Sequence, residues 1–397
     1  MTKRTADRHL PSGAAARKRL RPVVAACVAL PALLATTGFG SGGAPGSQGG
    51  GSGPSHGPEL SFIDTHQPPE DIIALPGTSW VVISAVTGAD HPGGMNLVNT
   101  RNEEVTPLWP AEEDIAYTPD LEAFPGCTAP PDEALPATHG INTVQTGERT
   151  FDLYVVYHGG RESIEVFSLD VRGKQPTISW RGCVVAPEGA IPNSVVALPD
   201  GGIAMTKFWD SRSPLFPQLF SGEPSGSLWT WHRESGWAEV PGSQLFGPNG
   251  IEVSEDGATL YTAETMKQRV VSIPTAGGDP TELAQMDFLP DNLRWTEAGT
   301  LLTTGQEYVP VTPEQVQACA VTGFDVPDSC IPGFDIVEID PVAGTSETVF
   351  STRTTEYRYT TVAAPVGREI WVGGNAINSI AVVSGLHRGH SAQGGHR

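Results

Sequence analysis

The sequence predicts an all-β fold, and two observations lead to that prediction. Glycine and proline account for 46 and 35 of the 397 residues and are scattered between apolar runs. Both residues break helix interiors, so long helices and helical bundles are disfavoured. The second observation is a phrase that recurs six times: a small or polar residue, an alternating apolar run, a turn, and a second apolar run.

Each copy of this phrase is typical of a β-hairpin, because two runs of strand length are joined by Asp-Gly or another glycine turn. The copies recur at intervals of about 43 to 70 residues, as expected of propeller blades with loop insertions. The sequence therefore predicts a six-bladed β-propeller over residues 59–386, since a β-sandwich would not require six copies of one phrase. The copies open at Glu70, His139, Asn193, Asn249, Asn292 and Thr360. We expect the stretch Glu59–Thr65 to close the ring against the last blade.

The two ends of the chain differ from the region between them. Residues 1–21 carry seven bases and one acid, and the apolar stretch Val23–Leu34 follows. A basic head before a short apolar segment is typical of a secretory signal peptide, expected at residues 1–37, with an uncleaved anchor as the alternative. We expect a flexible Gly/Ser-rich linker at 38–58 and a disordered, histidine-containing tail at 387–397. The mature protein is expected to be secreted and monomeric, without a stable membrane span.

The overall charge narrows the choice of partners. The chain has 45 acidic and 24 basic residues, a formal net charge of −21. Such a surface repels a phosphate backbone or an anionic membrane. We therefore expect that the protein does not bind nucleic acid.

The cysteines indicate disulfides if the protein is exported. Cys27 leaves with the signal peptide, and four cysteines remain, which allow three pairings in an oxidising compartment. Cys319 and Cys330 flank a loop-like stretch, so we pair them, which leaves Cys127 to pair with Cys183. A zinc site is the alternative, but no C-x-x-C spacing is present.

Pseudo-symmetry places the residues that open each copy at one level around the central channel. Among them, Glu70 brings a carboxylate, and Asn193, Asn249 and Asn292 bring amide oxygens; Asp291, next to Asn292, adds a second carboxylate. Five hard oxygen donors with two negative charges suit Ca²⁺, whereas zinc prefers nitrogen or sulfur. Each residue alone would more often be a turn or a solvated charge, and only the shared position favours a calcium site.

His139 occupies the same position in its copy, in the phrase His139-Gly-Ile. Calcium does not ionise bound water near neutral pH as zinc does, so a calcium-dependent hydrolase needs a separate base. An imidazole has a suitable pKa, and we assign His139 to proton transfer.

These residues resemble the paraoxonase/arylesterase family and, more broadly, the gluconolactonase, senescence-marker-protein and strictosidine-synthase superfamily of six-bladed propellers. The resemblance covers residues 59–385. It is carried by an ordered set of phrases: Glu70-Asp71-Ile, His139-Gly140-Ile141, Val155-Val-Tyr-His158, Ser163-Ile-Glu-Val-Phe, Asn249-Gly-Ile, Tyr261-Thr-Ala-Glu264, Asp291-Asn292 and Thr361-Val-Ala.

The resemblance implies two calcium ions in the channel and a catalytic histidine pair. It places the catalytic calcium on Glu70, Asn193, Asn249, Asp291 and Asn292, and the histidine pair on His139 and His158. It implies a second calcium at Asp71 and the Ile141 carbonyl, and a further aspartate at a position where this chain has Ser194. The family's disulfide between the chain ends has no counterpart here.

Two functions follow as hypotheses. The first is a secreted, calcium-dependent hydrolase of lactones and aryl esters, in which the metal polarises the carbonyl and His139 activates water. The second is a calcium-stabilised propeller that binds a small ligand or a protein partner without catalysis, since fold does not dictate function.

Overall fold

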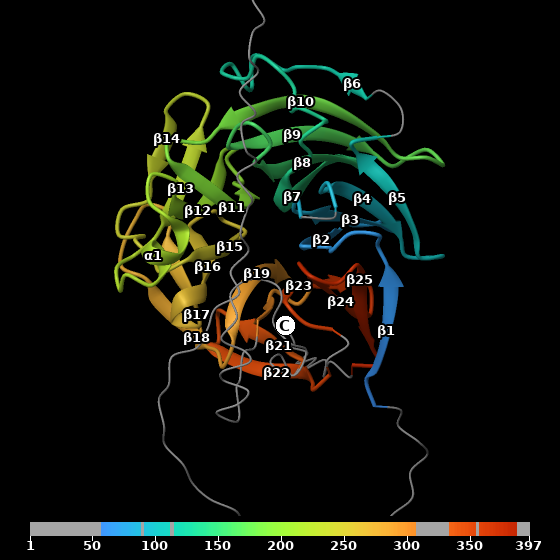
Figure 1. The fold of residues 1–397 in the computed structure, drawn as a ribbon, viewed down its shortest axis with the longest axis vertical. Helices are drawn as coiled ribbons and strands as arrows, with labels where there is room; N and C mark the ends of the chain where they lie inside the picture. The colour runs from blue at the N-terminus through green and yellow to red at the C-terminus, as the bar shows by residue number, and fades with distance from the viewer. Residues whose placement is uncertain (1–56, 89–90, 112–114, 307–332, 355–356, 387–397) are drawn as a thin grey trace, which may run out of the picture.

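The computed structural model describes residues 57–88, 91–111, 115–306, 333–354 and 357–386. Within these residues nearly all regular structure is β-strand, and six sheets stand around a common axis as blades (Figure 1). The prediction of an all-β, six-bladed propeller is confirmed. The expected signal peptide and tail lie outside the described residues, as does the linker up to residue 56.

Apart from the short edge strand β6 of the second blade, each of the first five blades starts at its innermost strand and continues outward through antiparallel neighbours; the predicted hairpins are these first two strands. The first blade consists of β2 (Asp71–Ala74), β3 (Trp80–Ala85), β4 (Gly94–Asn99) and β5 (Glu104–Trp109). The second consists of β7 (Thr138–Gly147), β8 (Thr150–Tyr157), β9 (Ser163–Asp170) and β10 (Thr177–Val185), with the short β6 (Ala116–Tyr117) parallel to β10. The third consists of β11 (Ala190–Ala197), β12 (Ile203–Asp210), β13 (Ser227–His232) and β14 (Gly236–Glu239).

The remaining blades follow the same order. The fourth consists of β15 (Pro248–Val253), β16 (Thr259–Glu264), β17 (Arg269–Pro274) and β18 (Thr281–Gln285). The fifth consists of β19 (Leu289–Trp295), β20 (Leu301–Gln306), β21 (Phe334–Asp340) and β22 (Thr345–Thr352). The sixth consists of β23 (Thr360–Val366), β24 (Glu369–Gly374), β25 (Ser379–Ser384) and β1 (Glu59–Asp64). The described helical segments are short: α1 (Leu215–Leu219) and the 3₁₀ turn η1 (Thr265–Lys267).

The ring closes through the sixth blade, which combines strands from both ends of the propeller. Strand β1 pairs antiparallel with β25, from Glu59 opposite Ser384 to Asp64 opposite Ser379. The expectation that residues 59–65 supply a closing strand is thus confirmed. Backbone hydrogen bonds, rather than a covalent link, join the first described strand to the last.

The six innermost strands contact one another in sequence around the axis, β2 with β7 and β23, β11 with β7 and β15, and β19 with β15 and β23. Apolar side chains fill the space between neighbouring blades; Trp109, for example, packs against Tyr157 and Phe167 of the next blade. Among the described residues, no helix is long and apolar enough to cross a membrane.

A disulfide joins Cys127 to Cys183, which confirms that pairing. Cys127 precedes His139 by 12 residues and Cys183 precedes Asn193 by 10, a spacing that predicts similar positions in adjacent blades, and this prediction is wrong. Cys183 lies on β10, and Cys127 lies in the segment between β6 and β7, so both belong to the second blade. This happens because the chain enters the second blade at its outer edge, through β6, before it reaches the innermost strand. The predicted partners Cys319 and Cys330 lie outside the described residues.

Candidate active site

The five predicted calcium ligands lie at the entrances to four innermost strands. Glu70 directly precedes β2, Asn193 lies in β11, Asn249 in β15, and Asp291 and Asn292 in β19. All five are buried, with exposed fractions between 0% and 9%. The structure therefore brings together residues that are up to 222 positions apart in the chain.

A β-bulge at the same position in β11, β15 and β19 redirects the side chains of four of these residues, all except Glu70. The pairing of the innermost strand with its neighbour shifts between Pro192 and Val195, between Pro248 and Ile251, and between Pro290 and Leu293. A bulge kinks a strand and redirects a side chain, which is why bulges often lie beside active sites. The same shift occurs in β7, between Thr138 and Ile141.

The bulges also correct the alignment of the fifth repeat. A proline precedes the ligand in four copies, as Pro69, Pro192, Pro248 and Pro290, and the residue after Pro290 is Asp291. The residue equivalent to Asn249 is thus Asp291, not Asn292. Asn292 corresponds instead to Gly250, one residue further along the strand.

Gly140 and Gly250 allow neighbouring innermost strands to approach closely at this level. A Cβ atom on Gly140 would lie 2.6 Å from the Asn193 carbonyl oxygen, and one on Gly250 would lie 2.5 Å from the Asn292 Cα. Real Cβ atoms do not approach backbone atoms this closely, so these positions need glycine. The close approach packs the ligand residues of successive blades around the axis.

Each predicted ligand carries one buried oxygen without a hydrogen-bond partner: Glu70 Oε2, Asn193 Oδ1, Asn249 Oδ1, Asp291 Oδ1 and Asn292 Oδ1. Such oxygens are rare in folded proteins, because each loses its hydration without compensation. Five of them in one cluster, two from carboxylates and three from amides, fit the ligand chemistry of Ca²⁺. The donor set thus suits a hard cation.

The raised pKa of Asp291 also indicates a site for a cation. Burial raises the pKa of Asp291 well above its usual value, and the charges of Glu70 and Asp71 raise it further, against a hydrogen bond from Asn249. Asn292 Nδ2 donates to Glu70 Oε1 at 3.1 Å, and the Thr361 hydroxyl donates to the Glu70 carbonyl. Buried carboxylates that lie close together repel one another when ionised. A divalent cation bound between them would compensate their negative charge.

The predicted histidine pair is formed, and a third residue extends it. His139 Nδ1 lies 3.1 Å from His158 Nε2, and His158 Nδ1 lies 2.5 Å from Glu162 Oε2. The Glu162 carboxylate accepts a hydrogen bond from His158 Nδ1–H. His158 Nε2 therefore carries no proton and accepts a hydrogen bond from His139 Nδ1–H. This order leaves the lone pair of His139 on Nε2, which lies 3.5 Å from both Glu70 Oε1 and Asn193 Nδ2.

Burial alone would lower the pKa of His139, but the negative charges of neighbouring carboxylates raise it by more. The charge of Glu70 and the hydrogen bond that protonated Nε2 donates to it raise this pKa, as do the charges of Asp71 and Glu162, so that the net shift is upward. His139 thus directs a ring nitrogen with a raised pKa toward the oxygen cluster. Glu162 was not predicted from the sequence; its signal is only its position in the turn after β8, four residues beyond His158.

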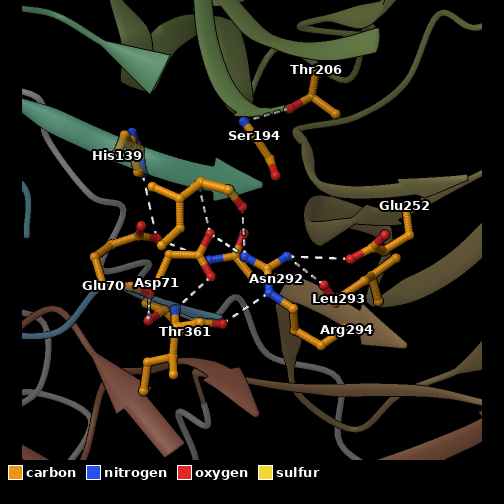
Figure 2. Close-up of polar contacts among 12 residues, drawn as sticks. Glu70, Asp71, His139, Ser194, Thr206, Glu252, Asn292, Leu293, Arg294 and Thr361 are labelled. Atoms are coloured by element: carbon orange, nitrogen blue, oxygen red, sulfur yellow. Dashed lines mark hydrogen bonds and ion pairs between the residues drawn. The ribbon is translucent and has the colours of Figure 1, made fainter. Parts of the chain in front are cut away.

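Asp71 and Ile141, the residues implied for a second calcium, are brought together but do not fit a second ion. Figure 2 shows Asp71 beside Arg294. The Arg294 guanidinium donates through Nη2 to Asp71 Oδ2 at 2.5 Å and to the Ile141 carbonyl at 2.9 Å. Both oxygens are already used, and Ser194 brings no charge. The expected second site thus holds a side-chain cation of the protein itself.

Cys127, Glu165 and Cys183 also lie close together, at the distance of metal ligands. The two sulfurs are joined in the disulfide, so neither can act as a thiolate ligand. This group is therefore not a candidate metal site.

Comparison with known proteins supports the superfamily. No curated protein matches the chain. The model of the SMP-30/gluconolactonase/LRE-like region matches residues 95–301, slightly more than half of the chain. The chain belongs to the SMP-30/gluconolactonase/LRE-like family. This family includes lactonases.

Solved structures with the same fold include members of the SMP-30/gluconolactonase/LRE-like family. The luciferin-regenerating enzyme is 14% identical, with 83% of this chain and 96% of that chain covered and a TM-score of 0.52. A protein assigned as a gluconolactonase is 14% identical, over 83% and 92% of the two chains, with a TM-score of 0.49. Virginiamycin B lyase from Staphylococcus aureus is 14% identical, over 82% and 99%, with a TM-score of 0.47. At such identities the likeness is one of fold alone.

Proposed function

We propose that this protein is an exported, calcium-dependent hydrolase of lactones and aryl esters, on the paraoxonase/arylesterase branch of its superfamily. The observation that carries the proposal is the cluster of five unpartnered oxygens, with the basic nitrogen of His139 beside it. A metal ligand set next to an oriented base is the arrangement that ester hydrolysis requires.

Different residues of the chain would bind the metal ion and transfer the proton. Glu70, Asn193, Asn249, Asp291 and Asn292 would hold the ion. Bound there, calcium would supply a Lewis acid that polarises the substrate carbonyl and stabilises the developing oxyanion. His139 Nε2 takes the proton from the attacking water, and the His158 and Glu162 contacts fix the neutral tautomer that has its lone pair on that nitrogen and orient the ring. The bulges and the glycine contacts hold these groups on strands rather than on loops.

Export is part of the proposal, on the basis of the basic and apolar segments in residues 1–37. The disulfide between Cys127 and Cys183 supports it, because such bonds persist mainly in oxidising compartments. Mass spectrometry of culture medium should find the chain there without its first 30 to 40 residues, roughly the length of a signal peptide. Full-length chain retained in the cell would contradict export.

The catalytic proposal is tested with a panel of lactones, aryl esters and phosphotriesters, assayed with calcium and after its removal with EDTA. We expect hydrolysis of lactones and aryl esters that EDTA abolishes and calcium restores. Glu70→Gln and Asn249→Ala should remove both the activity and the calcium-dependent rise in Tm, because binding to the folded state stabilises it. The exposed Glu255→Gln and Asn102→Ala serve as matched controls.

Two outcomes would contradict the proposal in different ways. Calcium binding without turnover of any substrate would favour the non-catalytic binding propeller. Full activity in EDTA, or in both ligand variants, would show that the oxygen cluster is not the catalytic centre.

A further inference from the structure

Arg294 is surrounded by oxygen atoms from four blades. Its Nε donates to the Ile72 carbonyl at 3.0 Å, and its Nη1 donates to the Leu293 carbonyl at 2.8 Å and to Glu252 Oε1 at 3.4 Å. Its Nη2 reaches Asp71 and the Ile141 carbonyl, as described above. Carboxylates and backbone carbonyls are also the oxygens with which proteins surround Ca²⁺.

The position is deeply buried and strongly acidic. Arg294 is 4% exposed and is the only lysine or arginine among the buried residues that the structure describes. Asp71 and Glu252 are 0% and 5% exposed. Two buried carboxylates require a positive partner, because an unpaired buried charge is strongly destabilising. Arg294 is that partner for both.

Both oxygens of Asp71 accept hydrogen bonds, and Oδ2, which faces the guanidinium, accepts two. Asp71 Oδ1 accepts the Ile72 backbone N–H at 2.8 Å, and Oδ2 accepts the Ile141 backbone N–H at 2.9 Å as well as the guanidinium. The carboxylate thereby ties β2 to β7, and Arg294 ties both strands to β19. This link involves only groups of the protein.

Two residues, Ser194 and Arg294, differ from what a second calcium site would require, and their effects on the local charge compensate each other. Ser194 is neutral where a second calcium would call for an aspartate, and its buried Oγ has no hydrogen-bond partner. Arg294, at the position that aligns with Ile73 of β2, Val196 of β11 and Glu252 of β15, brings a positive charge. A guanidinium carries one charge and a calcium ion two, so the guanidinium needs one carboxylate fewer.

We propose that the Arg294 guanidinium is a built-in cation that takes the place of a second calcium ion beside Asp71. The channel, as formed by the described residues, consequently holds one calcium at most, and the link among β2, β7 and β19 does not depend on metal. The inference concerns the cation beside Asp71 and is independent of whether the protein is a hydrolase.

The test counts calcium ions per chain by calorimetric titration and by elemental analysis after dialysis at millimolar calcium. Wild type is compared with Ser194→Asp, Arg294→Met and the double variant Arg294→Met/Ser194→Asp; the exposed Arg101→Met is the control. We expect one calcium per chain at most in wild type, Ser194→Asp and Arg101→Met. The double variant should bind one more than wild type, and calcium should raise its Tm more than that of wild type.

Stability in EDTA provides a second measurement. Arg294→Met should lower Tm in EDTA, because it leaves Asp71 and Glu252 without a counter-charge, whereas Arg294→Lys should keep the calcium count of wild type. Two calcium ions bound to wild type would overturn the inference, even if the double variant does not fold. A folded double variant that binds no more calcium than wild type would also overturn it. Wild type without any calcium would instead defeat the proposed function, while the gain in the double variant would still test Arg294.

Discussion

At the scale of single residues, the chain from Glu162 through His158 to His139 determines which nitrogen can act as a base. A carboxylate at one end fixes the tautomer of the first imidazole, and the first imidazole fixes that of the second. The acceptor nitrogen is thereby directed to the oxygen cluster. His139 shares its repeat position with the ligands, yet a neutral imidazole is a poor ligand for calcium, so proton transfer is its better role.

His139→Gln should therefore lower kcat by about 10²–10⁴ and leave calcium affinity nearly unchanged, because only the base is lost. Steady-state kinetics on the best lactone and calorimetric titration with calcium measure the two effects separately. Glu162→Gln should reduce kcat less and move the acidic limb of the pH–rate profile to lower pH, since the Glu162 charge helps to raise the pKa of His139.

His232→Gln is the matched control, because His232 pairs with Asp200 on the surface, away from the cluster. If His139→Gln lost calcium together with activity, the histidine would be structural. Unchanged hydrolysis of every lactone would exclude it as the base.

At the scale of the elements, the innermost strands provide both the packing and the site. The bulges in β11, β15 and β19 carry predicted ligands and the bulge in β7 carries His139, while Gly140 and Gly250 let the next strand approach in two of these blades. A regular strand would alternate its side chains between its two faces and could not bring Asn249 and Asp291 together from adjacent blades. The site thus depends on backbone irregularities that recur in the repeats.

Gly250→Ala should destabilise the fold by about 1–3 kcal/mol, because the new methyl group meets the backbone of β19 at 2.5 Å and cannot be accommodated by a rotamer change. It should also weaken calcium binding, since Asp291 and Asn292 lie on the displaced strand. Chemical denaturation and calcium titration measure the two effects. Gly126→Ala is the control, with no heavy atom within 4 Å of the added Cβ; equal stability of the two variants would contradict the close-packing argument.

At the scale of the whole molecule, the chain has a net charge of −21 and closes into a ring, and several of its carboxylate side chains are buried at the centre of that ring. The pairing of β1 with β25 closes the ring, and the innermost strands force Glu70, Asp71, Glu252 and Asp291 into one region. Burial raises the pKa of Glu252 to about 7, against the opposing charge of Arg294, and the charge of Asp71 adds to the rise. Burial likewise raises the pKa of Asp71 to about 6, although Arg294 opposes it.

These shifts predict that stability without calcium falls as pH rises. An unfolded glutamate has a pKa of about 4.3, so between about pH 4 and pH 7 the folded chain binds more protons than the unfolded chain. The stabilisation from a raised pKa is complete below that window and is lost as pH rises through it. Glu252→Gln should flatten the fall of Tm measured in EDTA, because it removes a pH-dependent contribution of up to about 3 kcal/mol to the free energy of unfolding across the window.

Glu255→Gln, at an exposed position of the same blade, should leave the Tm curve parallel to that of wild type. If Glu252→Gln also gave a parallel curve, the buried carboxyl would not be the source of the pH dependence.

The sequence by itself predicted the blades, the closing strand, the five oxygen-bearing residues of the cluster and one disulfide, and the family resemblance added the histidine pair. It could do so because hairpins are local, and because a repeated phrase places equivalent residues at one level around an axis. The tertiary structure alone decided that Asp291 is the residue equivalent to Asn249, since a bulge shifts the register without changing the sequence pattern. It alone placed Glu162 behind His158 and placed both bridged cysteines in one blade.

Arg294 shows most clearly what the repeats could not predict. On β19 it is one more polar residue after Asp291 and Asn292, and nothing local indicates its partners. Its acceptors come from β2, β7 and β15, and Asp71 lies 223 residues away in the chain. Whether a buried charge is stabilised depends on oxygens that only the closed ring brings together, so the cation beside Asp71 could be identified only from the folded protein.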